Sequence, residues 1–139
     1  MVEAPPPVVA LIGFKRSKMA LVGRMGVLVI RDGTVRVLGR KGSVPLDAAV
    51  GALTARLTKT GSVELAADGQ SMVIYGVADL GNVHQELQQI IIDESHGAEL
   101  IGPAPTGVLG VYSLKAVTGP AKISRALTEA LHARGAGQG

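Results

Sequence analysis

The sequence contains no cysteine, no tryptophan and few other aromatic residues. Without cysteine, the chain can form no disulfide, zinc-thiolate site, iron–sulfur cluster or thiol nucleophile. Proteins that bind single-stranded nucleic acid usually stack bases on several aromatic rings, whereas Phe14, Tyr75 and Tyr112 are few and scattered. The composition therefore predicts an aliphatic core and argues against single-stranded nucleic acid as a partner.

Long apolar runs are also missing from the chain. The longest run near the N-terminus, residues 8–14, includes a glycine and is far shorter than the roughly 20 residues that span a bilayer. We therefore expect no transmembrane segment. A cytoplasmic location fits a chain without cysteine. A secretory signal has its basic residues before the apolar run, whereas here Glu3 and three prolines precede the run and the basic residues follow it. Residues 1–7 are therefore expected to form a disordered leader.

Hydrophobic residues make up 47% of the 139 residues, enough for one domain with a normal core. Turns that contain glycine divide the chain into short runs rich in Val, Ile and Leu, a pattern typical of strands. Asp32-Gly33 and Asp68-Gly69 each lie between two such runs, as in type I′ hairpins. Strands are predicted near residues 8–14, 20–30, 34–40, 50–58, 62–67 and 71–77.

Two glycines interrupt the second predicted strand, and two helices are predicted after residue 80. Gly23 and Gly26 indicate a bulge or sharp bend in that strand. Apolar residues then recur with a helical period, which predicts a helix near 82–95 with Asn82 as its N-cap. Residues 108–117 are expected to form one more strand. Pro120 opens a second predicted helix, which ends near Gly135.

Basic residues gather in the first third of the chain. Eight of the fourteen Lys and Arg residues lie within 27 positions, opposed there only by Asp32. Ammonium and guanidinium groups bind phosphate oxygens, so this basic N-terminal cluster is our candidate site for an anionic headgroup. The alternative is a solvated basic face that aids solubility. The cluster consists of Lys15, Arg16, Lys18, Arg24, Arg31, Arg36, Arg40 and Lys41.

Patterns that would indicate catalysis are weak. Residues 102–107 have the glycine spacing of a phosphate-binding loop but lack the lysine that such a loop needs. Asp93, Glu94 and His96 are close together, yet they fall at the end of a predicted helix and no His-x-x-x-His pair occurs. We therefore expect no enzyme activity, no cofactor and no metal site.

The order of these features resembles that of a bacterial pleckstrin-homology-like domain of the PH or GRAM type. The resemblance rests on residues 26–42, on Val44-Pro45-Leu46 before the fourth predicted strand, on the Asp-Gly hairpins and on the helix near 82–95. It implies a mainly β, α+β fold: a small bent antiparallel barrel or sandwich of residues 8–96, capped by a C-terminal helix. Residues 97–139 would then form an extension with a strand and a helix.

The resemblance implies a non-enzymatic module that binds phosphoinositides, other anionic lipids or protein segments. In the family, the members that bind phosphate do so through basic residues around the loop between the first two strands. The corresponding residues here are Lys15, Arg16, Lys18 and Arg24. The leading hypothesis is docking on anionic lipid headgroups or another anionic ligand, peripheral at the inner membrane face. The alternative is a protein-interaction or oligomerisation module. Duplex nucleic acid is a weaker alternative, because the net charge is only +3.

Overall fold

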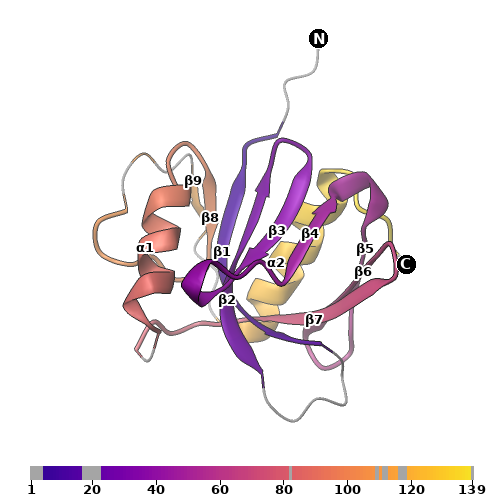
Figure 1. Cartoon of the computed structure of the whole chain (residues 1–139), viewed down its shortest axis with the longest axis horizontal. Helices are drawn as coiled ribbons and strands as arrows, with labels where there is room; N and C mark the ends of the chain where they lie inside the picture. Colours follow the sequence, from indigo (N-terminus) through magenta and orange to yellow (C-terminus); the bar gives the residue numbers. More distant parts are fainter. Residues whose placement is uncertain are drawn as a thin grey trace.

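The computed structural model of the chain describes residues 5–16, 23–81, 83–108, 110, 113–115 and 119–138. Within them, nine strands form one sheet, accompanied by two α-helices (Figure 1). The strands are β1 (Val8–Lys15), β2 (Arg24–Arg31), β3 (Thr34–Leu38), β4 (Leu46–Ala49), β5 (Thr54–Leu57), β6 (Ser62–Ala67), β7 (Gln70–Gly76), β8 (Glu99–Ile101) and β9 (Ser113–Lys115). The helices are α1 (Gln85–Glu94) and α2 (Pro120–Ala133), with 3-10 turns η1 (Arg40–Gly42) and η2 (Val50–Ala52).

Both Asp-Gly hairpins form as the sequence predicts. Asp32 and Gly33 have φ angles of 53° and 74°, and Asp68 and Gly69 have 48° and 79°. Arg31 pairs with Thr34 and Ala67 with Gln70, so each hairpin closes over two residues with positive φ. This local chemistry fixes the register of β2 with β3 and of β6 with β7.

Strand β1 lies at the centre of the sheet, in the order β4-β3-β2-β1-β7-β6-β5. One edge of β1 pairs with β2 from Val8 to Phe14. The other edge is shared: residues 8–10 pair in parallel with β8, and residues 12–15 pair antiparallel with β7. Since β4 and β5 end this path, the sheet stays open among the described strands.

The two faces of β1 and β2 enter two separate apolar clusters. Val8, Ala10 and Ile12 belong to the main core, together with residues of α2. Val9 and Leu11 belong to a second cluster that includes residues of α1. Because successive strand residues point to opposite faces, the two helices cover opposite faces of these strands (Figure 1).

Helix α2 approaches the sheet closely at Gly76, the last residue of β7. A Cβ at Gly76 would lie 2.5 Å from the Cβ of Ile123, so only glycine allows this approach. The fully buried Ser124 accepts a hydrogen bond from the Gly76 N–H through its Oγ at 2.9 Å. The main core therefore includes a specific polar contact between sheet and helix.

Arg134 follows α2 and joins three segments. Its Nη2 donates to the carbonyl of Pro6 at 2.8 Å, its Nη1 donates to the carbonyl of Ala130, and Glu99 of β8 lies 3.9 Å away. Burial lowers the pKa of Arg134, while the Glu99 carboxylate acts in the opposite direction. The carbonyl of Pro7 accepts a further hydrogen bond from Glu99, so residues 6 and 7 of the expected leader are held against the fold.

The α+β, mainly β class is confirmed, and several details differ from the prediction. The predicted strand near 50–58 is β5, which is only four residues long, and β4 precedes it as a strand that we did not predict. The register of β1 with β2 is continuous through Gly26, so this ladder contains no bulge. Gly26 leaves room for a neighbouring side chain instead, since a Cβ at this position would lie 3.0 Å from the Phe14 ring.

The helices also differ from the prediction. Helix α1 begins at Gln85 with His84 as its N-cap, whose Nδ1 accepts a hydrogen bond from the N–H of Glu86. Asn82, the predicted N-cap, lies outside the described residues. We expected the helix near 82–95 to cap the barrel, but α1 packs on β1 and β2, and α2 supplies the helix of the main core. Within 108–117, the described strand is β9.

Candidate functional site

One end of the sheet carries a cleft of about 900 Å³. Phe14 pairs with Arg24 and Lys15 pairs with Val73, so the end of β1 meets the start of β2 and the middle of β7, whose first residues extend beyond it. Leu46 pairs with Val37, which brings the start of β4 to this same end. Antiparallel pairing thus gathers three connections around the cleft, each of which supplies lining residues.

Three basic residues line this cleft: Lys15, Arg16 and Arg24. None of the described lining residues is acidic, and none of the ion pairs between described residues involves these three side chains. The cleft is therefore positive without a carboxylate in its described wall. A group with several anionic oxygens would find charge and hydrogen-bond donors here.

Neutral side chains complete the lining. Ser43, Gln70 and Ser71 are exposed and offer two hydroxyl groups and an amide to a ligand. Phe14 and Met72 are buried members of the main core, so the cleft opens over the edge of that core. Val44 and Pro45 form part of the wall before β4. The cleft thus combines cationic, polar and apolar surface.

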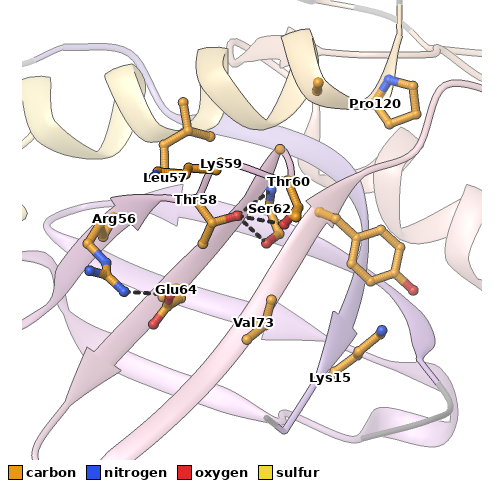
Figure 2. Close-up of a pocket in the computed structure, with 13 residues that line it drawn as sticks. Lys15, Arg56, Leu57, Thr58, Lys59, Thr60, Ser62, Glu64, Val73 and Pro120 are labelled. Carbon is orange, nitrogen blue, oxygen red and sulfur yellow. Dashed lines mark hydrogen bonds and ion pairs between the residues drawn. The ribbon is translucent and has the colours of Figure 1, made fainter. Parts of the chain in front are cut away.

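A second hollow of about 1130 Å³ shares Lys15 with the cleft and is otherwise lined by residues of β5, β6 and β7, of the turn between β5 and β6, and of the start of α2 (Figure 2). Its charges are partly matched, since the Nη2 of Arg56 lies 2.7 Å from the Oε1 of Glu64. The hydroxyl of Thr58 bonds those of Thr60 and Ser62 at 3.0 and 2.8 Å. This second hollow has lining residues of both charges, and its polar side chains bond one another. It therefore suits an anion less well than the cleft.

Tyr75 explains how the strands beside the cleft pack. A Cβ at Gly13 would lie 2.1 Å from the Tyr75 ring, and one at Gly23 would lie 2.3 Å from its hydroxyl oxygen. The ring therefore occupies the space that two side chains would need. Gly23, interpreted from sequence as a bend, instead leaves room for an aromatic ring next to Lys15.

The other basic residues of the predicted cluster do not line the cleft. Arg31 lies at the far end of β2, where its Nη2 donates to the carbonyl of Glu94 at 2.8 Å and holds α1. Arg36 stands in the middle of β3, across from Asp47. Arg40 and Lys41 are exposed in η1, where the Lys41 N–H donates to the Glu86 carboxylate. Lys18 lies outside the described residues.

The acidic candidates at the end of α1 have structural partners. Asp93 accepts a hydrogen bond from Gln89 at 2.8 Å, and Glu94 pairs with Arg31. Across the described ranges, no group of three His, Asp or Glu side chains is placed to hold a metal ion. Neither described helix is long and apolar enough to cross a membrane.

Sequence reasoning missed the polar residues on the far wall of the cleft. Ser43 precedes β4, and Ser71 is the second residue of β7, far from the basic cluster in sequence. The Asp-Gly turn at 68–69 located the hairpin, but nothing in the local pattern placed it beside Arg24. Only the pairing of β1 with both β2 and β7 brings these segments together.

Fold and cleft together define an open, mainly antiparallel α+β domain with a cationic cleft at one end of its central strand. Comparison with protein-family models, with curated proteins and with solved structures gave no match to this chain. The resemblance to pleckstrin-homology-like domains therefore stays a prediction.

Proposed function

We propose that this chain is a non-enzymatic binding module whose cleft takes an anionic ligand, such as the headgroup of an anionic lipid. One observation carries the proposal: Lys15, Arg16 and Arg24 line a single cleft whose described wall has no acidic residue. The ligand class follows from this chemistry, because lysine and arginine bind phosphate oxygens through charge-assisted hydrogen bonds. We also propose that the module works in the cytoplasm, at the inner membrane face.

The expected strength of this attraction is modest and additive to first order. Each Lys or Arg near an anionic membrane contributes about 1 kcal/mol. Three such residues would contribute about 3 kcal/mol, or roughly a hundredfold in affinity. The exposed hydroxyls of Ser43 and Ser71 would add hydrogen bonds to the same group. Such a module would bind reversibly and depend on salt, as expected for peripheral docking.

The likeness to pleckstrin-homology-like domains supports the proposal without deciding it. Among the described residues, seven strands precede α1, and the segment Val44-Pro45 leads directly into β4. The cleft adjoins the connection between β1 and β2, where the family's phosphate-binding members carry their basic residues. We propose membership of this family on these grounds.

The test compares two double variants with the same change in net charge. Arg16→Ala with Arg24→Ala removes two cations from the cleft, and Lys122→Ala with Arg125→Ala removes two exposed cations of α2 that do not line it. The probes are inositol hexakisphosphate, followed by calorimetry, and vesicles of equal parts phosphatidylcholine and phosphatidylglycerol, followed by co-sedimentation. The cleft variant should bind at least one probe about thirtyfold more weakly than the wild type.

The α2 variant should lose far less affinity, and binding by the wild type should weaken as salt rises. Raising the ionic strength from about 0.1 M to about 1 M shortens the Debye length from about 10 Å to about 3 Å. Equal losses in both variants would mean that only net charge matters, and unchanged binding by the cleft variant would reject the site.

The second candidate function is a protein-interaction or oligomerisation module, and the unequal edges of the sheet favour it. Strand β5 has its outer edge covered, since Ala55 donates to the carbonyl of Gly137 and Gly137 donates to that of Leu53, both at 2.9 Å. Strand β4 pairs with β3 alone among the described residues. An edge of this kind can accept a strand from a partner or from a second copy. A purely monomeric chain in light scattering would argue against self-association.

A further inference from the structure

Val44 stands out as an apolar side chain that folding leaves in water. It is 48% exposed, and among the described residues no other large hydrophobic residue is exposed. Val44 is not in a loose segment: the N–H of Gly39 donates to the carbonyl of Ser43 at 2.9 Å, and that of Ser43 donates to the carbonyl of Arg40 at 3.1 Å. The fold therefore presents Val44 to solvent from a turn that is closed by hydrogen bonds.

The position of Val44 ties it to the cationic cleft. Val44 and Pro45 line the same cleft as Arg16 and Arg24, and the exposed Arg40 and Lys41 precede them in η1. Leu46, which follows Pro45 in sequence, is 2% exposed and anchors the turn in the main core. The apolar side chain of Val44 thus adjoins the cationic cleft, and the preceding turn η1 carries two exposed cations beside the Glu86 carboxylate that the Lys41 N–H bonds.

A soluble phosphate and the surface of an anionic bilayer would interact differently with the exposed Val44 side chain. A small soluble phosphate is fully hydrated and gains nothing from an exposed valine beside it. A bilayer surface offers phosphates at the level of the cations and apolar material about 5–10 Å deeper, so one approach satisfies both. Cationic side chains also keep their charged ends at the headgroups while their methylene stems lie in less polar surroundings.

We infer that the ligand of the cleft is the surface of an anionic bilayer, into which Val44 inserts at the level of the headgroups and upper acyl chains. The inference rests on the proposed function and names the source of the anion. Lys15, Arg16 and Arg24 bind headgroup phosphates around the cleft, and the turn 43–45 enters the interface beside them. Orientation follows: this end of the sheet faces the membrane, and η2 at the opposite end faces away.

The absence of tryptophan gives this inference a direct probe. Val44→Trp places a single indole in the turn 43–45, and Ala52→Trp places one at an exposed site in η2, at the opposite end of the sheet. With vesicles of equal parts phosphatidylcholine and phosphatidylglycerol, the emission of Val44→Trp should shift to the blue and be quenched by brominated lipid. The emission of Ala52→Trp should not change, and vesicles of phosphatidylcholine alone should shift neither.

A second pair of measurements separates insertion from charge. Val44→Ser keeps the net charge and should weaken vesicle binding about threefold, whereas Val44→Trp should strengthen it by a similar factor. Binding of inositol hexakisphosphate should not follow this order, with Trp above Val and Val above Ser, because a hydrated anion gains nothing from a more apolar side chain in the cleft wall. Thermal unfolding should show that both exposed substitutions leave the fold intact.

The outcomes distinguish failure of the inference from failure of the proposed function. If the wild type binds anionic vesicles while the Val44→Trp emission stays unchanged, charge alone holds the protein and insertion is refuted. If the wild type binds inositol hexakisphosphate but no vesicles, the ligand is a soluble anion: the inference and the proposed membrane location fail, while the proposed anion-binding module stands. If neither probe binds, both are overturned.

Discussion

Replacing Ser124 by alanine tests how α2 is held on the sheet. Ser124 is fully buried, and its Oγ accepts the hydrogen bond of the Gly76 N–H at 2.9 Å. Alanine removes this acceptor and leaves a buried N–H without it, which costs about 1–3 kcal/mol. Unfolding entropy is about 2.1 cal/mol/K per residue, so 139 residues give about 0.3 kcal/mol/K. The melting temperature of Ser124→Ala should therefore fall by about 3–10 °C.

The matched control is Thr128→Val, one turn further along α2. The Thr128 hydroxyl donates to the carbonyl of Ser124 at 2.9 Å, but that carbonyl lies inside a helix and keeps its helical N–H donor. Valine has nearly the shape of threonine, so we expect a loss below about 1 kcal/mol. Calorimetric melts of both variants measure the difference. A Ser124→Ala variant no less stable than Thr128→Val would show that this hydrogen bond does not hold α2.

Two further predictions concern stability. A chain ended at residue 97 should lose its cooperative thermal transition in circular dichroism, because it lacks the buried Ile123, Leu127 and Leu131 of the main core; a retained transition would contradict the assignment of α2 to that core. Gly33→Ala should cost about 1–2 kcal/mol in urea denaturation, since the φ angle of Gly33 is 74°, whereas Gly51→Ala, which meets open space without a positive φ, should be near neutral. Equal effects would refute the argument from backbone strain.

The hairpins could be predicted because their cause is local. An Asp-Gly pair between two apolar runs favours positive φ at both positions whatever lies around it. The short strand β4 has no such signal: its sequence, Leu-Asp-Ala-Ala, lacks β-branched residues. It is extended because Val35 and Val37 present an edge with which it can pair. Strand β8, three residues long, likewise depends on β1 as its partner.

The candidate site was partly predictable for a geometric reason. Lys15, Arg16 and Arg24 flank the connection between β1 and β2, so antiparallel pairing alone keeps them together. Arg31 ends the same strand that Arg24 begins, and seven steps of about 3.3 Å place their Cα atoms about 23 Å apart. A cluster that is dense in sequence is thus divided between two ends of one strand. The turn with Val44 joins the cleft through the sheet, which no local pattern indicates.

By itself, the sequence determined the mainly β class, the two Asp-Gly hairpins and the positive charge next to the first hairpin connection, because each depends on neighbouring residues. Tertiary structure decided which helix covers which face. Strands β1 and β2 are apolar on both faces, with Val8 and Ala10 in one cluster and Val9 and Leu11 in the other, so their pattern suits a helix on either side. Gly76 and Ser124 settle the choice for α2, since the missing Cβ allows the close approach and the hydroxyl accepts the free N–H.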